Sequence, residues 1–161
     1  MNLNEYNIAV DQHADGMFRF ILKNIRDEDK ARDIVQDSFE KLWRNVDGVN
    51  FLKVKSYLYT TAYHTMIDLI RREKRKEDFE NVDVGKYAHS EQYTDLSEVL
   101  DEALKRLSDV QRSVILLRDY EGYSYAEIAK ITNLSESQVK VYIYRARKSL
   151  KEYIGSIESI V

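Results

Sequence analysis

The sequence predicts an all-α protein with an N-terminal helical bundle and a C-terminal four-helix domain that contains a helix-turn-helix, joined by a flexible acidic linker. Three observations favour this fold class. The 161 residues include no proline and only five glycines, and a chain so poor in these residues has few sharp turns. Apolar residues recur at helical spacing through most of the chain. A strongly acidic stretch without that spacing separates two mildly basic segments.

The first two helices are predicted over about residues 4–24 and residues 28–46. Asp27 precedes the second helix and suits its N-cap. The apolar residues expected to face the core of the first helix are Ile8, Met17, Phe18, Ile21 and Leu22. Those of the second helix are Ala31, Ile34, Val35, Phe39 and Leu42.

A third long helix is predicted over residues 53–76, and the three helices are expected to form one antiparallel bundle. Its buried stripe is predicted to be Val54, Leu58, Thr61, Ala62, Thr65, Met66 and Leu69. The opposite face carries Ser56, Thr60, Tyr63, Ile67 and Arg71. The helix ends in "RREKRK", where five of six side chains are basic.

The charge pattern predicts two domains. Residues 1–76 carry 14 Lys and Arg against 12 Asp and Glu, and residues 103–161 carry ten against seven. Between them, residues 77–102 carry one lysine against nine acids. We therefore predict domains over residues 1–76 and 95–161 with a linker over 77–94, since long structureless loops are uncommon within one compact domain. The alternative is a polar loop inside a single domain.

Serine capping signals define the helices of the C-terminal domain. Ser108, Ser124 and Ser135 are each followed three residues later by Gln or Glu, which is the capping-box pattern. They predict helix starts at about 108, 124 and 135. Gly122 suits the C-cap of the helix that begins at Ser108, and a further helix begins at Asp95 or Ser97.

The last two helices fit a helix-turn-helix. Ala129 is small enough for a close helix contact, Asn133 tolerates a positive φ in the turn, and Val139 faces back to the first helix. The buried stripe of the final helix is Val139, Tyr142, Ile143, Ala146 and Leu150. The opposite face is typical of a helix that enters the major groove of DNA, with polar residues first and basic residues later. This candidate DNA face consists of Glu136, Ser137, Lys140, Val141, Tyr144, Arg147, Lys148 and Lys151.

Four stretches follow one another along the chain: "DEDKARDIVQDSFEKLWRNV", "VKSYLYTTAYHTMIDLIRREKR", "QRSVILLRDYEGYSYAEIA" and "SESQVKVYIYRARKSL". In this order they resemble bacterial RNA polymerase sigma factors of the extracytoplasmic-function (ECF, group 4) type. The resemblance covers nearly the whole chain and implies a sigma region 2-like domain over residues 1–76 and a region 4-like domain over 95–161. It implies a protein that binds core RNA polymerase, directs it to promoters and helps to open the duplex, without being an enzyme.

The resemblance implies where each partner binds. The polymerase contact corresponds to Asp33, Gln36, Asp37, Glu40 and Trp43, although core burial is the favoured interpretation for Trp43. The −10 promoter element corresponds to Asn50, Phe51, Tyr59, Tyr63, His64, Arg71, Arg72 and Arg75. The −35 element corresponds to Glu136, Ser137, Lys140, Val141, Tyr144, Arg147 and Lys148 on the last helix. Aromatic rings suit unpaired bases and arginines suit phosphates; a core role for Phe51 and for some of the tyrosines remains an alternative.

One departure from the family concerns base preference. His64 stands where the family usually has asparagine, which leaves the base preferred there open. His64 and Asp68 are spaced as metal ligands can be, but two ligands without a third do not indicate a site. No cofactor and no metal are expected.

Composition constrains the location and the alternatives. The chain has no cysteine, no run of about 18 apolar residues and no signal-peptide pattern at its start, so we expect a cytoplasmic protein without membrane insertion of its own. Two other classes stay open: an operator-binding regulator that needs no polymerase, and a helical adaptor that binds no nucleic acid. The expected partners are core RNA polymerase, double-stranded promoter DNA, its melted −10 strand and an anti-sigma factor, whose existence the sequence does not determine.

Overall fold

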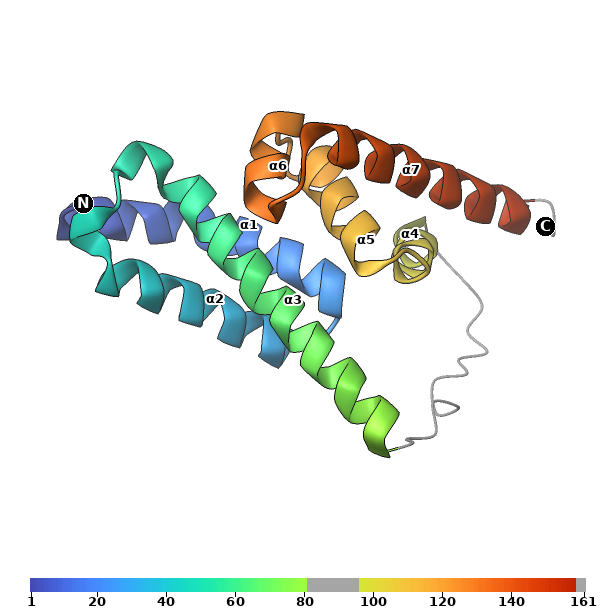
Figure 1. Ribbon diagram of the computed structural model, residues 1–161, viewed down its shortest axis with the longest axis horizontal. Coiled ribbons are helices and arrows are strands. Elements are labelled where there is room, and N and C mark those ends of the chain that lie inside the picture. The colour runs from blue at the N-terminus through green and yellow to red at the C-terminus, as the bar shows by residue number, and fades with distance from the viewer. Residues whose placement is uncertain (81–95, 159–161) are drawn as a thin grey trace.

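The structure, a computed structural model, describes residues 1–80 and 96–158, and every regular element in these two ranges is helical. The predicted all-α fold with two helical domains is confirmed. Figure 1 shows the helices of the N-terminal half on one side and those of the C-terminal half on the other. The two halves touch, and their buried side chains form one continuous apolar cluster.

The N-terminal half is a bundle of three helices, α1 (Leu3–Ile25), α2 (Glu28–Arg44) and α3 (Val54–Glu80). Asp27 caps α2 as predicted, because its side chain accepts a hydrogen bond from the backbone of Lys30. Every residue predicted for the buried face of α2 is buried. Two short 3₁₀ turns, η1 (Val46–Gly48) and η2 (Phe51–Lys53), connect α2 to α3.

Helix α3 extends beyond its predicted end. It runs to Glu80, which lies within the stretch predicted as linker. Charge does not mark the end of this helix, because no glycine or proline stands between Glu77 and Glu80 to end it. The remainder of the predicted linker, residues 81–94, lies outside the described residues.

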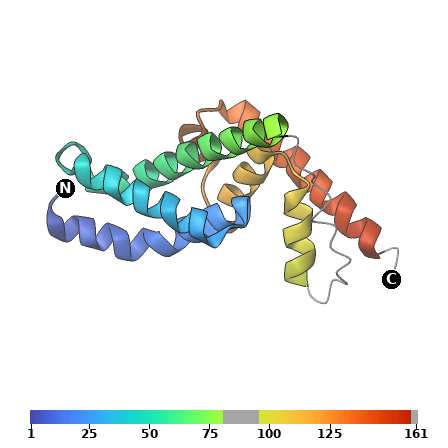
Figure 2. The ribbon, with the colours of Figure 1, turned by 90° about the horizontal axis from the view of Figure 1, so that it is seen from below.

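Helix α3 is buried on two faces, which the amphipathic pattern did not indicate. Leu58, Ala62 and Met66 of the predicted stripe are fully buried against α1 and α2. Tyr63 and Ile67, which were expected on the opposite face, are only 5% and 8% exposed. The C-terminal half covers them, because α6 packs along α3. Figure 2 shows the same adjacency from a second direction.

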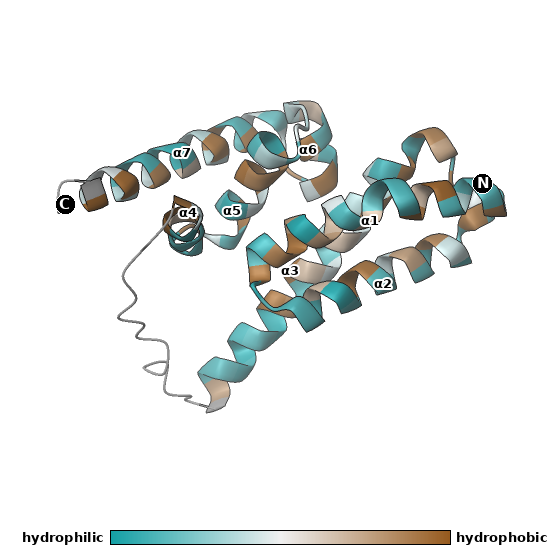
Figure 3. Cartoon of the chain, turned by 180° about the vertical axis from the view of Figure 1, so that it is seen from behind, coloured by the Kyte–Doolittle hydropathy of each residue, from teal (hydrophilic) through white to brown (hydrophobic). Residues whose placement is uncertain are grey.

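The C-terminal half contains α4 (Leu96–Lys105), α5 (Asp109–Ile115), the π-helical segment η4 (Leu116–Tyr120), α6 (Tyr125–Thr132) and α7 (Glu136–Glu158). The predicted capping serines precede α5, α6 and α7 directly. Ser108 and Ser135 form reciprocal capping boxes with Gln111 and Gln138. Figure 3 shows apolar residues along the inner faces of the helices and a hydrophilic end to α3.

The turn between α6 and α7 is a helix-turn-helix with the predicted geometry. Asn133 ends α6 in the left-handed region at φ 59°, and the amide of Leu134 donates to the carbonyl of Ala129 at 3.2 Å. Val139 is fully buried where α7 faces α6. This turn fixes the direction in which α7 leaves the domain.

Asn133→Val is expected to destabilise the protein by about 1–2 kcal/mol, because a β-branched side chain in the left-handed region is strained. Urea unfolding followed by circular dichroism measures the change. Asn133→Gly is the matched control and should alter the free energy of unfolding by only a few tenths of a kcal/mol, since glycine adopts this conformation without strain. Equal stability of the valine variant and the wild type would contradict the assignment.

Candidate nucleic-acid and protein interfaces

One exposed stripe runs along α2. Asp33, Gln36 and Glu40 are exposed, and Asp37 is partly exposed. The carboxylate of Asp37 lies 3.0 Å from the Nζ atom of Lys41. Because these positions are three or four residues apart, they share one face of the helix. The structure thus brings the predicted protein-binding residues of α2 onto a single, mainly acidic surface.

Trp43 continues this stripe, and its favoured assignment to the core is wrong. Its side chain is 48% exposed, and its ring meets the ring of Tyr6 edge to face at 5.1 Å. The hydroxyl of Tyr6 donates to the carbonyl of Phe39 at 3.3 Å. Burial, with a contribution from the charge of Glu40, raises the pKa of Tyr6. The periodicity of α2 places Trp43 one step beyond the buried Leu42, so it lies at the edge of the bundle.

The loop before α3 presents a polar and an apolar side chain to solvent. Asn50 is exposed, and its side-chain oxygen accepts from the amide of Leu52 at 3.0 Å, which fixes the start of η2. Phe51 is partly buried and packs against the core. Leu52 is 88% exposed and was missed by sequence analysis. Leu52 lies in a short apolar stretch with Phe51 and Val54, and the sequence pattern did not indicate that Leu52 is the residue that points to solvent.

The aromatic face of α3 is divided between burial and exposure. Tyr59 and Tyr63 are 2% and 5% exposed, whereas His64 is exposed and meets the ring of Tyr63 edge to face at 5.2 Å. Tyr59 contacts the rings of Phe20 in the N-terminal half and Tyr123 in the C-terminal half. The predicted base-stacking tyrosines are therefore covered in this arrangement of the two halves.

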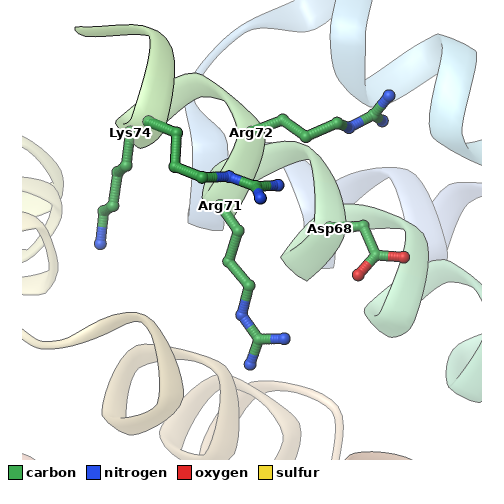
Figure 4. A pocket seen from close by; sticks show the side chains of 5 residues that line it. Asp68, Arg71, Arg72 and Lys74 are labelled. Atoms are coloured by element: carbon green, nitrogen blue, oxygen red, sulfur yellow. The ribbon is translucent and has the colours of Figure 1, made fainter. Parts of the chain in front are cut away.

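The last part of α3 is a basic surface. Arg71, Arg72 and Arg75 are exposed and line an open hollow together with Asp68 and Lys74. Figure 4 shows the four labelled side chains of this hollow spreading in different directions from the same helix. Such a surface of several guanidinium groups can neutralise successive phosphates of a nucleic-acid backbone.

The predicted DNA face of α7 is exposed throughout, and two contacts hold its basic side chains. Arg147 donates to both carboxylate oxygens of Asp119 at 2.6 and 3.2 Å, and this hydrogen bonding raises the pKa of Arg147. Lys140 lies over the ring of Tyr125 at 5.5 Å, and Arg118 lies over the same ring at 4.4 Å. The face therefore has defined geometry, although a pair as exposed as Arg147 and Asp119 adds little stability.

The described residues contain no group of three or more His, Cys, Asp or Glu side chains that could hold a metal ion. Over the same part of the chain, no helix is long and apolar enough to cross a membrane.

Comparison with known proteins accounts for both halves. Residues 9–76 match the family pattern "Sigma-70 region 2", and residues 97–150 match "Sigma-70, region 4". The chain is 33% identical over 149 residues to the RNA polymerase sigma factor SigV of Bacillus subtilis, a match that covers 89% of this chain and 87% of SigV. This protein belongs to the ECF sigma factors.

Other relatives and solved structures agree. The chain is 32% identical over 153 residues to the ECF sigma factor SigL of Mycobacterium tuberculosis, covering 88% of this chain and 84% of SigL. The fold matches the sigma factor RpoE crystallised with the anti-sigma factor NepR from Bartonella quintana, with a TM-score of 0.80, 27% identity and coverage of 95% and 98%. It also matches CnrH in complex with the cytosolic domain of CnrY, with a TM-score of 0.73, 25% identity and coverage of 96% and 90%.

Family membership decides between the classes that the sequence left open. As a sigma factor, the protein binds RNA polymerase and directs it to specific promoters for transcription initiation. The operator-binding and adaptor hypotheses are thereby set aside. The sigma-factor fold also explains why a helix-turn-helix is combined with a second helical domain that has its own basic surface.

Tyr59 and Tyr123 are expected to ionise well above pH 10, the ordinary pKa of tyrosine, because burial raises the pKa of both. Since the folded protein favours the neutral phenols, this contribution to stability is present below pH 10 and is lost as the pH rises further. Absorbance at 295 nm during alkaline titration measures tyrosinate formation. Exposed tyrosines should ionise in an early phase and buried ones in a late phase. Replacing both residues by phenylalanine should reduce the late phase, to which Tyr63 also contributes because burial raises its pKa, and should leave the early phase unchanged. Loss of amplitude from the early phase instead would contradict the burial of Tyr59 and Tyr123.

Proposed function

We propose that this sigma factor uses residues 1–76 to hold core polymerase and the −10 element, and residues 95–161 to hold the −35 element. The observation that carries this assignment is the separation of three exposed surfaces: the acidic stripe of α2, the basic end of α3 and the DNA face of α7. Their chemistry suits a protein partner, a single strand with its phosphates, and a major groove, respectively.

The polymerase contact consists of Asp33, Gln36, Asp37, Glu40 and Trp43. Its carboxylates lie on one helical face, and Trp43 adds an exposed aromatic ring at one end. An exposed tryptophan surrounded by charged groups is the kind of residue that becomes a binding hot spot. The polar part of the stripe favours orientation and a fast association rate more than affinity.

The −10 contact consists of Asn50, Phe51, Tyr59, Tyr63, His64, Arg71, Arg72 and Arg75. In this assignment the loop at Asn50 receives an unstacked base, whose removal from the duplex costs a few kcal/mol. Rings along α3 stack with neighbouring bases, and the arginines hold phosphates. Stabilising the unpaired strand in this way helps to open the promoter.

The −35 contact consists of Glu136, Ser137, Lys140, Val141, Tyr144, Arg147 and Lys148. In the helix-turn-helix arrangement, residues near the start of the second helix reach base edges and later basic residues reach phosphates. Arg147 is already oriented by Asp119 on the neighbouring segment η4. This support reduces the side-chain entropy that is lost on binding DNA.

The two domains are proposed to act together and without catalysing a reaction. The formal net charge of −3 gives the free chain little general affinity for DNA, so polymerase is needed to bring both domains to one promoter. Once one element is bound, contact with the second becomes intramolecular. Because transcription takes place in the cytoplasm of bacteria, we assign the protein to that compartment.

An anti-sigma factor is proposed as a further partner. RpoE and CnrH, which resemble this chain over nearly its whole length, were solved with an anti-sigma factor and with the cytosolic domain of CnrY, respectively. Co-purification of the native protein from its own cells, followed by mass spectrometry, tests for such a partner. Recovery of polymerase subunits alone would count against it.

Run-off transcription from a genomic promoter library tests the promoter assignment. Core RNA polymerase is supplied with and without this protein. Transcripts that need the protein and share two motifs at fixed spacing are the expected result. Transcripts with a single motif near −10 would contradict the role of the C-terminal domain.

Replacing Asp33 and Glu40 together by lysine is expected to weaken binding to core polymerase at least tenfold, because it reverses two charges on the proposed contact. Fluorescence anisotropy with labelled protein measures the dissociation constant. Asp11→Lys together with Glu152→Lys makes the same charge change at exposed positions elsewhere and should have little effect. Similar weakening by both double variants would indicate a general electrostatic effect rather than a contact.

Replacing Arg71 and Arg72 together by glutamine is expected to lower the salt dependence of promoter binding by the holoenzyme. Each phosphate contact contributes about 0.9 to the slope of log K against log salt concentration, so the slope should fall by about 2. Arg32→Gln, at an exposed position of α2, should leave the slope unchanged. An unchanged slope in the double variant would exclude both side chains from phosphate contact.

A further inference from the structure

The C-terminal half covers the part of α3 that is assigned above to the unpaired −10 strand. We propose that the protein inhibits itself: an acidic and aromatic face of the C-terminal half occupies the single-strand face of α3 and must leave before DNA can bind. This inference rests on the proposed −10 site. It differs from inhibition by an anti-sigma factor because all the groups involved belong to this chain.

An aromatic ring takes the place in which a base would stack. The ring of Tyr123 meets the ring of Tyr59 edge to face, with the ring centres 5.3 Å apart and an interplanar angle of 64°, and the Phe20 ring lies 5.9 Å from the Tyr59 ring. Lys55 of α3 lies 4.6 Å from the centre of the Tyr123 ring. Proteins bind single-stranded nucleic acids with similar groups: aromatic rings that stack on bases and basic side chains that contact the backbone. Tyr123 therefore satisfies the groups that a nucleotide would contact.

Tyr59 has little freedom to turn away while the contact is closed. A Cβ atom on Gly16 of α1 would lie 2.6 Å from the hydroxyl of Tyr59, so only glycine leaves room for this ring. The carboxylate of Glu121 lies beside the same position. The ring is thus enclosed by α1, Phe20 and the C-terminal half.

Within residues 1–80 and 96–158, the ion pairs made by Arg19, Lys23, Arg26 and Lys74 across the contact share one polarity. The N-terminal half supplies the bases, and the C-terminal half supplies the acids. Arg19 donates to both oxygens of Glu121 at 2.8 and 3.3 Å, and Lys74 donates to Asp109 at 2.5 Å. Asp101 forms ion pairs with Lys23 of α1 and with Arg26, the C-cap residue of α1, each at 3.2 Å.

These carboxylates stand where phosphates are expected. Lys74 lines the basic hollow with Arg71, Arg72 and Arg75, and its charge is directed to Asp109 instead of DNA. Burial by itself would raise the pKa of Asp109, but hydrogen bonds from Lys74 and Arg112 outweigh it, so the pKa lies below its ordinary value. The acid is therefore ionised at neutral pH and competes with phosphate for the same lysine.

The contact is specific, yet it contains features that favour opening. A buried hydrogen bond joins the hydroxyl of Ser113 to the side-chain oxygen of Asn24 at 3.1 Å and fixes the alignment of the two halves. In contrast, the hydroxyl of Tyr123 is buried without a hydrogen-bond partner among the described residues. Arg19 and Lys74 are more than half exposed, so salt screens their ion pairs. Opening lets water reach the Tyr123 hydroxyl, and the ion pairs of Arg19 and Lys74 that it breaks are weak.

Energy transfer within the full chain tests the closure. The protein has no cysteine, so Asn7→Cys and Glu152→Cys at exposed positions of α1 and α7 accept a donor and an acceptor dye selectively. Glu121→Arg places two like charges against each other and should lower the transfer efficiency. Adding Arg19→Glu reverses the pair and should restore it. Unchanged transfer in Glu121→Arg would overturn the proposal that this contact holds the halves together.

Binding of a labelled random-sequence single strand of 20 nucleotides tests the inhibition. Glu121→Arg should bind at least fivefold more tightly than Asp11→Arg, which makes the same charge change on an exposed part of α1. The reversed pair should bind as weakly as the wild type, and saturating oligonucleotide should lower energy transfer in the wild type. Equal affinity of the two arginine variants would overturn inhibition by the contact.

The same experiment separates this inference from the −10 assignment. An opened Glu121→Arg chain that binds no single strand would overturn both the assignment of α3 and the inhibitory role of the contact. An opened chain that binds strongly, together with a closed wild type that binds equally strongly, would keep the −10 assignment and overturn only the inhibition.

Discussion

Burial of α3 on two faces is the constraint on which the rest of the structure depends. One face packs on α1 and α2 through Leu58, Ala62 and Met66, and the other is covered by the C-terminal half through Tyr59, Tyr63 and Ile67. Burying each large side chain contributes about 1.5–3 kcal/mol. The first face holds the N-terminal bundle together. The second exists only while the two halves touch, so it couples domain arrangement to access to α3.

The charges at the contact between the two halves are complementary. Arg19, Lys23 and Lys74 of the N-terminal half pair with acidic side chains of the C-terminal half. Exposed pairs of this kind add little stability singly, but together they give the contact a defined orientation. The same bases would attract a nucleic-acid backbone. In the proposed self-inhibition, these positive side chains are occupied by the acids of the C-terminal half until the two halves separate.

The DNA face of α7 is built on a different principle, because it stays exposed while the halves are closed. Val139, Ile143 and Ala146 anchor the helix on its buried side, and Asp119 and Tyr125 hold Arg147 and Lys140 from outside. Closure therefore affects the two proposed DNA surfaces unequally: it covers the aromatic part of α3 and leaves α7 open.

The amino-acid sequence by itself determined the local features. Capping serines, the left-handed Asn133 and the core stripe of α2 follow from interactions within a few residues, and the four sigma-like stretches identified the family. Only the tertiary structure decided the state of residues whose surroundings come from distant parts of the chain. Tyr63 and Ile67 are buried by helices that lie far away in sequence, and Trp43 is exposed because the bundle ends beside it. Helical periodicity reports which residues share a face, but it carries no information on how many faces a second domain will cover.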